Sequence, residues 1–349
     1  MTGTILKKHT LLRSGFPLTA LLLSLAFLSP ALSAKTVTDD AGNRVEVPDI
    51  ANRIADGWFA HHSLLMTLGA GDRIVATVNH PRDRPWMFKI QPSLNQALQT
   101  PGHEFSSEAL VLRHVDVIFV AKNDPAANSY RQAGIPVVMM GFTDFPSMER
   151  SLLTTAEVVG TPLALQRAEE YNRYLNRQIA VVRDKTRTLT PQQRPTVLHI
   201  QSLHPLKVDG RNTLINTWIT LAGGRNVAES VDGNMKEITP EEVLAWQPDY
   251  IILDAGAGTL AQSPYRGLFS QLRAVKLNHV VRNPSGVFPW DRYGTEVALQ
   301  IPWAARLFHP DLFPDINMVR QTRDFYRQFF DYPLTESQAK RILDAQPPG

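Results

Sequence analysis

Two stretches of the chain share one pattern of apolar and polar positions. The segments "SSEALVLRHVDVIFV" (residues 106–120) and "TPEEVLAWQPDYIIL" (residues 239–253) each begin with apolar residues at helical spacing and end in a short apolar run typical of a buried strand. Aligning the two segments places Glu108 on Glu241. We therefore expect the same helix and strand twice, with one glutamate in register in both copies.

A second pair of segments repeats in the same order. The sequence "DGWFAHHSLLMTLGAG" (residues 56–71) aligns without a gap on "DGRNTLINTWITLAGG" (residues 209–224). Two repeats in one order predict a chain of two related halves. The first half carries an insertion between its two elements, "NHPRDRPWMFKIQPSLNQAL" (residues 79–98).

Short apolar runs alternate with helical segments along both halves. The runs are "DRIVATVN", "VDVIFVAK", "IPVVMMGF", "PTVLHIQS", "PDYIILDAG" and "HVVRNP". Because strands that alternate with helices form parallel sheets, we expect an α/β fold with two Rossmann-like lobes and a ligand cleft between them. A hairpin is expected before the first lobe, around the turn "DDAGN".

A long helix is predicted between the two halves, from Pro162 to about Lys185. This stretch has no glycine and no further proline, and its apolar stripe is formed by Leu163, Ala168, Tyr171, Leu175, Ile179 and Val182. A helix of this length would span roughly 36 Å at about 1.5 Å per residue, so it would act as a stiff connector. The expected divisions are 1–34, 35–146 (first lobe), 147–193 (linker) and 194–349 (second lobe).

The first 34 residues have the pattern of an export signal. Basic residues precede an apolar run from about Phe16 to Leu28, and small residues follow it. The run is shorter than the roughly 20 residues that a bilayer span needs, so we expect cleavage after Ser33 or Ala34. The chain has no cysteine, which excludes disulfides, a thiolate metal site and a lipid-modified cysteine. This combination favours a Gram-negative periplasm.

Charge argues against nucleic acid and membrane partners. The chain has 36 basic and 33 acidic residues, and the predicted signal holds three of the basic ones and none of the acidic ones. The mature protein would therefore be neutral overall, and it shows no clustered basic stripe.

Several of these segments carry a resemblance to a known family. The sequences "DDAGNRVEVP", "SSEALVLRHVDVIFV", "LKVDGRNTLINTWITLAGGRNV", "ITPEEVLAWQPDYIIL" and "NPSGVFPWDRYGTEVALQIPWAARLFHPDLFPD" resemble the helix-linked periplasmic solute-binding proteins of ABC importers for ferric siderophores, haem and cobalamin. The segment "FYRQFFDYPLTESQAKRIL" is similar to the iron-complex branch. The resemblance implies a monomeric receptor without an intrinsic cofactor that delivers its ligand to an ABC permease and its ATPase.

The resemblance gives Glu108 and Glu241 a role. In that family the glutamate of each lobe lies on an exposed helix edge and pairs with arginines of the permease. Ion pairs at the rim of an interface steer association and fix register, which suits two carboxylates on two rigid lobes. The alternative for either residue is a glutamate that favours the positive end of its helix dipole.

The candidate ligand-binding residues follow the carboxyl ends of the expected strands or lie in the insertion. They mix cations with flat apolar groups, which suits a large, negatively charged, partly aromatic metal chelate, with a ferric siderophore as the leading candidate. The residues are Trp58, His61, His62, Arg82, Arg84, Trp86, Met87, Phe88, His103, Lys122, Ser202, His204, Lys207, Trp290, Arg292 and Tyr293.

The adjacent His61 and His62 raise the possibility of a metal contact. Neighbours on a helix point about 100° apart, so both cannot easily bind one ion. One of them could complete the coordination of a bound chelate through a ring nitrogen, and the alternative is a polar pocket lining or surface position. Trp86 and Trp290 are expected as pocket walls, whereas the tryptophans in helical segments are expected to pack: Trp218, Trp246 and Trp303.

The sequence is also compatible with other ligands, and other classes of protein must be considered. A nickel or cobalt chelate such as metal-histidine, haem and cobalamin are alternative ligands. A receptor for a bare metal ion would need three or four convergent His, Asp or Glu ligands, and the sequence shows no obvious set. An enzyme is disfavoured, because the sequence has no G-x-S-x-G, H-E-x-x-H, Walker or dinucleotide glycine motif.

Overall fold

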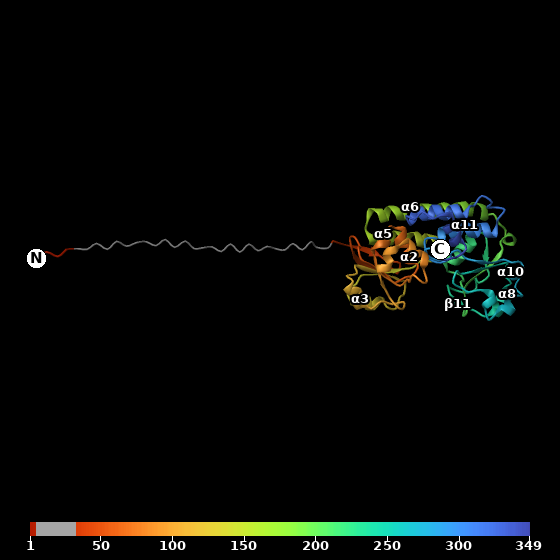
Figure 1. Ribbon diagram of the computed structural model, residues 1–349, viewed down its shortest axis with the longest axis horizontal. Coiled ribbons are helices and arrows are strands. Elements are labelled where there is room, and N and C mark those ends of the chain that lie inside the picture. Colours follow the sequence, from red (N-terminus) through yellow and green to blue (C-terminus); the bar gives the residue numbers. More distant parts are fainter. Residues whose placement is uncertain (5–32) are drawn as a thin grey trace. The chain divides into compact units, whose positions relative to one another are not determined.

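The computed structural model describes residues 1–4 and 33–349, and residues Ser33–Gly349 form one compact unit. The predicted export signal falls almost entirely outside the described residues. No helix in the described part of the chain is both long enough and apolar enough to cross a membrane. Figure 1 shows that the compact unit consists of two lobes, with α6 running along one side of both.

The N-terminal lobe is built on a parallel sheet. Its strand order is β5-β4-β3-β6-β7 and every pairing is parallel. The strands are β3 (Ile54–Asp56), β4 (Ile74–Thr77), β5 (Leu98–Gln99), β6 (Val117–Ala121) and β7 (Val137–Met140). The predicted hairpin precedes the sheet as an antiparallel pair, β1 (Ala34–Thr38) and β2 (Arg44–Pro48).

The C-terminal lobe has a mixed sheet with a parallel centre. Strand β12 lies between β8 and β13 and is parallel to both, whereas β9 and β11 add an antiparallel edge. The strands are β8 (Thr196–Leu203), β9 (Leu206–Val208), β10 (Arg225–Asn226), β11 (Lys236–Glu237), β12 (Tyr250–Leu253) and β13 (Val280–Arg282).

Both faces of the two parallel sheets are covered. Successive side chains of a strand point to opposite faces, and in β6 Phe119 belongs to one apolar cluster while Ile118 and Val120 belong to another. In β12, Ile252 and Ile251 divide between two clusters in the same way. The two Rossmann-like α/β lobes predicted from the alternation of elements are therefore confirmed.

The described residues form helices α1 to α13, from the N-terminal lobe to the last helix before the C-terminus. Their bounds are α1 (His61–Thr67), α2 (Pro85–Ile90), α3 (Ser107–Leu112), α4 (Ala127–Gln132), α5 (Phe145–Val159), α6 (Pro162–Thr186), α7 (Leu214–Leu221), α8 (Pro240–Trp246), α9 (Arg266–Phe269), α10 (Arg273–Lys276), α11 (Val297–Phe308), α12 (Met318–Phe329) and α13 (Glu336–Leu343). The division expected between residues 146 and 147 falls inside α5.

The sequence repeats correspond to repeated structure. The first pair of segments forms α3 with β6 and α8 with β12, and the second pair forms α1 and α7. Glu108 lies in the first turn of α3 and Glu241 in the first turn of α8, and both are exposed. The helix and strand expected twice, with a glutamate in register, are present in both lobes.

The long connector is α6, which has 25 residues and ends one residue beyond the predicted Lys185. Its stripe is buried at Ala168, Tyr171, Leu175, Ile179 and Val182, and these residues belong to the largest apolar cluster. Leu163 was expected in this stripe, but it is 48% exposed, because the neighbouring Ala164, which is fully buried, takes the core-facing position in the first turn.

Three polar contacts tie α6 and α1 to the segment before α11. The Tyr171 hydroxyl donates to the Thr295 carbonyl oxygen at 2.6 Å, and the Thr67 hydroxyl donates to the Thr295 hydroxyl at 2.8 Å. The Thr295 amide donates to Ser63 Oγ at 3.1 Å. All four residues are fully buried. Because they come from both sides of the linker, these bonds limit how far one lobe can rotate against the other.

Truncation of the buried stripe of α6 tests how much the fold depends on it. Leu175 is fully buried, so Leu175→Ala should lower the free energy of unfolding by about 2–5 kcal/mol, the range for leucine truncation in a core. Val181, on the same helix, is 54% exposed, and Val181→Ala should change that free energy by no more than about 0.5 kcal/mol. Urea denaturation followed by circular dichroism measures both, and equal losses would show that α6 is not anchored through this face.

Candidate ligand-binding cleft

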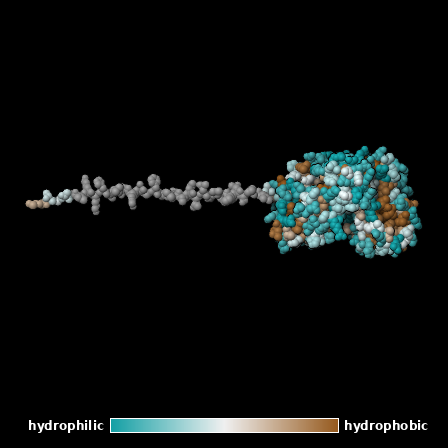
Figure 2. All heavy atoms as spheres, in the orientation of Figure 1, coloured by the Kyte–Doolittle hydropathy of each residue, from teal (hydrophilic) through white to brown (hydrophobic). Residues whose placement is uncertain are grey.

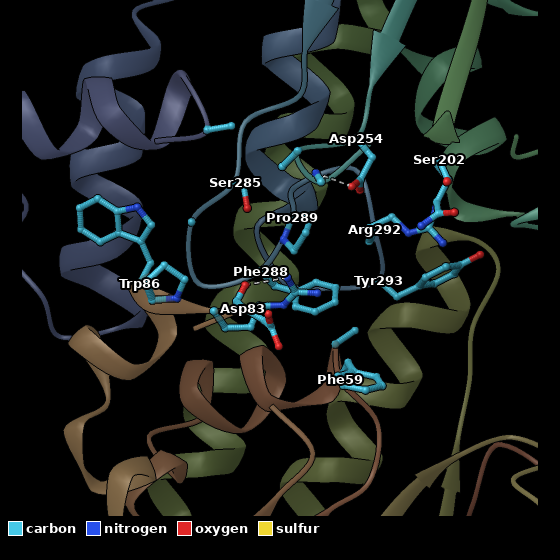
Figure 3. A pocket seen from close by; sticks show the side chains of 18 of the residues that line it. Phe59, Asp83, Trp86, Ser202, Asp254, Ser285, Phe288, Pro289, Arg292 and Tyr293 are labelled. Atoms are coloured by element: carbon cyan, nitrogen blue, oxygen red, sulfur yellow. Dashed lines mark hydrogen bonds between the residues drawn. The ribbon is translucent and has the colours of Figure 1, made fainter. Parts of the chain in front are cut away.

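A cavity of about 580 Å³ lies between the two lobes. Its walls come from the segment after β3, the segment before α2, the ends of β8 and β12, the loop before α11 and the C-terminal residues 345–347. Figure 3 shows Asp254, Ser202 and Arg292 reaching into this space opposite Asp83 and Phe59. In the space-filling view the surface is hollowed between the lobes on the side away from α6 (Figure 2).

Six of the residues predicted to bind ligand line this cavity: Trp58, Arg84, Trp86, Ser202, Arg292 and Tyr293. Lys122 lies instead in an adjoining hollow of about 870 Å³, together with Asn123 and Arg150. Trp58 and Tyr293 border both spaces. With Phe142 they form an aromatic wall, with ring centroids 5.6 to 6.3 Å apart.

The two adjacent histidines are not pocket residues, so that prediction was wrong. His61 and His62 are fully buried. His61 Nδ1 lies 3.0 Å from Asp56 Oδ2 and its Nε2 lies 3.0 Å from Thr155 Oγ1, while His62 Nε2 lies 2.7 Å from Thr77 Oγ1. Their ring nitrogens already face protein partners in the core, so neither imidazole is free to meet a metal in the cleft.

Trp290 was also misplaced, because it is a core residue rather than a pocket wall. Its side chain is fully buried, and its Nε1 donates to the Glu296 carboxylate at 3.0 Å. Glu296 also accepts from the Tyr326 hydroxyl, and burial raises the pKa of Glu296 to about 7.

Several further candidates lie outside the cavity wall. Met87 and Phe88 belong to the apolar core, and Arg82 and His204 are exposed away from it. His103 is exposed and lies edge-on to Phe59, with ring centroids 5.3 Å apart. Lys207 is half-buried on β9. Proximity in sequence to strand ends was therefore too coarse a criterion for these side chains.

The cavity also contains residues that the sequence reasoning missed. They are mainly Phe59, Asn234, Asp254 and the C-terminal Gln346, while Asp83 and Phe288 fall in segments where ligand-binding residues were expected. Asp254 carried a usable signal, because it directly follows β12 and polar residues after parallel strands gather at the ligand-binding edge of a sheet. Gln346 carried none, since only the fold brings the C-terminus beside α2, where Trp86 Nε1 donates to the Gln346 carbonyl oxygen at 2.9 Å.

A buried chain of charged groups supports the C-terminal wall. His199 on β8 faces Asp209 Oδ2 at 2.7 Å and Asp291 Oδ2 at 2.6 Å, and Arg292 Nη1 donates to Asp209 Oδ2 at 2.9 Å. His199, Asp209 and Asp291 are fully buried, and Arg292 is 8% exposed. Both imidazole nitrogens must donate to satisfy the two carboxylates, so His199 is an imidazolium.

The opposite charges of these four residues stabilise one another. Burial alone would lower the pKa of His199, but the hydrogen bonds and charges of Asp209 and Asp291 outweigh burial and raise that pKa to about 9. Burial would likewise raise the pKa of Asp209, whereas Arg292 and His199 hold it below its usual range. The result is a guanidinium at the cavity wall whose position is fixed by a buried partner.

Arg84 supplies a second cation from the N-terminal lobe. Its guanidinium carbon lies 4.8 Å from the centroid of the Phe288 ring, and its Nη1 donates to the Asp83 carbonyl oxygen at 3.0 Å. Its buried Nε has no hydrogen-bond partner among the described residues. Burial lowers the pKa of Arg84, with nearby Asp254 and Asp83 acting in the opposite direction.

The arrangement is chemically suited to holding an anion between the lobes. Arg84 and Arg292 enter from opposite lobes, and arginine forks recognise carboxylate, catecholate or oxyanion oxygens. Among the described residues no group of three or more His, Asp or Glu side chains is placed to hold a metal ion.

Two α/β lobes joined by one long helix, with a polar and aromatic cleft between them, define a helix-linked solute-binding protein. The family model for periplasmic binding proteins matches residues 60–286, which is more than half of the chain. The protein belongs to that family, as the resemblance of its motifs implied. Proteins of this family work with an ABC permease and an ATPase.

Similar proteins bind different ligands. The molybdate-binding protein MolA of Haemophilus influenzae is 22% identical over 339 residues, covering 89% of this chain and 94% of that protein. A structure of MolA bound to molybdate matches with a TM-score of 0.77 at 20% identity, covering 86% of this chain and 99% of that one. A periplasmic solute-binding protein from Veillonella parvula matches with a TM-score of 0.75 at 25% identity, covering 89% and 97%. Helicobacter pylori CeuE in complex with Ni-His matches with a TM-score of 0.72 at 15% identity, covering 89% and 99%.

The buried imidazolium predicts a pH-dependent stability. The pKa of His199 is about 9 in the folded protein and ordinarily 6.5, so its stabilising contribution is complete below pH 6.5 and is lost as pH rises through 9. The melting temperature should therefore fall between pH 7 and pH 9.5. His199→Asn should melt at a lower temperature throughout and with a smaller pH slope, measured by thermal circular dichroism. An unchanged slope in this variant would contradict the assignment.

Proposed function

We propose that this protein is the substrate-binding component of an ABC importer for an anionic metal compound, with a ferric siderophore as the leading candidate ligand. It would be exported by a cleaved signal, remain without lipid in the periplasm and act as a monomer. The observation that carries the proposal is the pair Arg84 and Arg292, which face one cavity from opposite lobes. A ligand that bridges them is held by both lobes at once.

The size of the cleft supports a bulky ligand. The cavity of about 580 Å³ adjoins the hollow of about 870 Å³ beside Lys122, and Trp58 and Tyr293 border both spaces. Sites for small molecules typically enclose about 300–1,000 Å³, so these spaces together suit a chelate better than a bare ion. Trp58 and Tyr293 offer flat surfaces for the organic part of such a chelate, and the arginines offer donors to its oxygens.

A tetrahedral oxyanion such as molybdate is the second candidate. It is favoured by the likeness to MolA in both sequence and structure. Arg84 and Arg292 would serve an oxyanion as well as a chelate, since both ligands present negatively charged oxygens. The nickel-histidine alternative has less support: contact through His61 or His62 would require a buried, already bonded imidazole to leave the core. Haem and cobalamin remain in the panel of ligands to be tested.

The exposed glutamates support docking to a permease. Glu108 and Glu241 begin α3 and α8, which lie on different lobes on the side away from α6 (Figure 1). Glu108 also accepts a hydrogen bond from Ser106 at 3.0 Å, so it contributes to the start of its helix. Two carboxylates on separate lobes would contact the permease at two points and fix the orientation of the receptor.

A receptor that delivers a ligand to a permease needs only to bind and release it, so we propose no catalytic step for this protein. Modest closure of the lobes is expected, since the buried bonds of Thr295 to Tyr171, Thr67 and Ser63 resist rotation. Turnover of a ferric siderophore ester by the purified protein would contradict the binding role, and a rotation of tens of degrees on binding would contradict modest closure.

Ligand titration with paired arginine variants tests the cleft. Ferric siderophores of the catecholate, hydroxamate and carboxylate classes, molybdate, haem, cobalamin and nickel with histidine are titrated against tryptophan fluorescence. Arg84→Gln should weaken binding of the preferred ligand by roughly tenfold to a hundredfold, because it removes hydrogen bonds from a charged group. Arg82→Gln, which changes the same charge two residues away but outside the cavity wall, should leave affinity within about twofold.

The outcome of that titration separates the two candidates. Binding of a ferric siderophore without binding of molybdate supports the leading proposal, and the reverse result supports the oxyanion. Equal losses in the two arginine variants would mean that general charge, rather than the position of Arg84, draws the ligand. Binding of none of these compounds would overturn the proposal of an anionic metal ligand.

Permease docking is tested separately from ligand binding. Replacing Glu108 and Glu241 together by alanine should abolish uptake in vesicles that carry the cognate permease and ATPase, while ligand affinity stays unchanged. A double replacement of the exposed Glu46 and Glu229, one on each side of the linker, is the matched control and should transport normally. Loss of ligand affinity in the first variant, or normal uptake by it, would show that the two glutamates do not dock the receptor.

A further inference from the structure

The Asp254 carboxylate occupies an unusual position in the cleft. It follows β12, lines the cavity and is only 9% exposed. Its Oδ1 accepts a hydrogen bond from the Gly256 amide at 2.8 Å (Figure 3). Within the described residues, no other side-chain hydrogen bond and no ion pair reaches this carboxylate. An acceptor oxygen of Asp254 therefore remains available at the wall of the ligand space.

The nearby cations are directed to other partners. Arg292 Nη1 is bound to Asp209 Oδ2, and both guanidinium ends of Arg282 donate to the carbonyl oxygens of Asp254 and Gly258. The neighbouring Asp291 adds a negative charge, and burial together with Asp291 raises the pKa of Asp254 to about 6. At pH 8 Asp254 is thus an ionised carboxylate in an anion-binding cleft, near Arg84, Arg282 and Arg292 but in an ion pair with none of them.

The same cavity contains an unpaired donor. Arg84 Nε is buried and has no hydrogen-bond partner in the described part of the chain. Buried polar groups in folded proteins are almost always hydrogen-bonded, and Arg84 lines the cavity, so an acceptor for its guanidinium is expected from the ligand. A ligand that satisfies both residues must therefore supply a hydrogen-bond acceptor to Arg84 and a hydrogen-bond donor to Asp254.

We infer that Asp254 determines specificity in this cleft, by admitting anions that carry a hydrogen-bond donor beside their negative group and rejecting anions that carry none. The inference rests on the proposed function, because it concerns the ligand of the same cleft. It narrows the ligand class to compounds such as a chelate with a free hydroxyl or amide N–H next to its carboxylate or catecholate, or an oxyanion that keeps a proton.

The physical basis is that a ligand with a donor forms a hydrogen bond with the Asp254 carboxylate, whereas a ligand with acceptors alone is repelled by its charge. A ligand hydroxyl or N–H donates to Asp254 and satisfies its buried acceptor. A fully ionised oxyanion has only acceptors, so its oxygens meet the carboxylate charge with no proton between them, in a site that excludes much of the water. Sites with a fixed acceptor discriminate strongly between ligands that differ in one donor, because the mismatch leaves buried polar groups unpaired.

Two inorganic anions test this discrimination directly. Hydrogen phosphate and molybdate are both tetrahedral dianions at pH 8, but only hydrogen phosphate carries a proton. Isothermal titration calorimetry gives the affinities of the wild type, Asp254→Asn and Asp83→Asn for each anion. Asp83 lines the same cavity but is exposed, so its variant makes the same change of charge without altering the buried acceptor.

The expected result is a change in the ratio of the two affinities. Asp254→Asn, whose amide can donate, should bind molybdate more tightly and hydrogen phosphate more weakly, which lowers the preference for hydrogen phosphate by roughly tenfold to a hundredfold. Asp83→Asn should change both affinities in the same direction and keep their ratio within about twofold. Thermal melting of each variant checks folding, and Asp254→Ser provides a second form if Asp254→Asn is unstable.

Each other outcome counts against the inference. An unchanged ratio in Asp254→Asn overturns it, and so does an equal change in Asp83→Asn. If neither anion binds to any form at 10 mM, Asp254 is not what excludes molybdate, and the inference fails as well. A siderophore that binds while the ratio stays unchanged would overturn only the role of Asp254. A changed ratio without binding of any panel chelate would instead overturn the proposed siderophore ligand.

Discussion

The structure depends on one buried face of α6. Ala168, Tyr171, Leu175, Ile179 and Val182 belong to an apolar cluster that also contains residues of both lobes, so the helix is part of the core of each. The helix cannot bend away from this cluster without exposing apolar surface, and the burial of apolar surface is the main stabilising contribution to folding. The separation of the lobes is therefore nearly fixed before any ligand arrives. The cleft exists because the helix holds two sheets apart on one side only.

The cleft that results is polarised by buried charge. His199, Asp209 and Asp291 hold Arg292 in place from behind, while Arg84 comes from the insertion of the other lobe. A guanidinium that is already oriented loses little conformational freedom when an anion binds, which favours affinity. The paired charges also make the site sensitive to the loss of any one of them, because the partner would be left buried and uncompensated.

Sequence patterns succeeded where a local rule acts along the chain. The alternation of strands and helices, the stripe of α6 and the two glutamates in register all follow from periodicity or repetition, and the structure contains each of them. The capping box of Thr335 and Gln338 at the start of α13 is likewise a local feature, because it joins residues three apart in the chain. Predictions failed where the sequence pattern does not determine the direction in which a side chain points. His61 and His62 follow the first strand as expected, but the turn of α1 points both rings into the core.

The sequence by itself determined the two-lobed α/β fold, the long linker and the general place of the cleft, because periodicity and strand order are properties of consecutive residues. Six of the predicted ligand residues do line the cavity. Only the tertiary structure decided which polar groups meet: that Trp290 packs inside against Glu296, that Gln346 returns to α2, and that Asp254 lies near arginines without pairing with one. Such contacts join residues far apart in the chain, and their geometry is set by packing and by the need to satisfy buried charge, neither of which leaves a pattern in neighbouring residues.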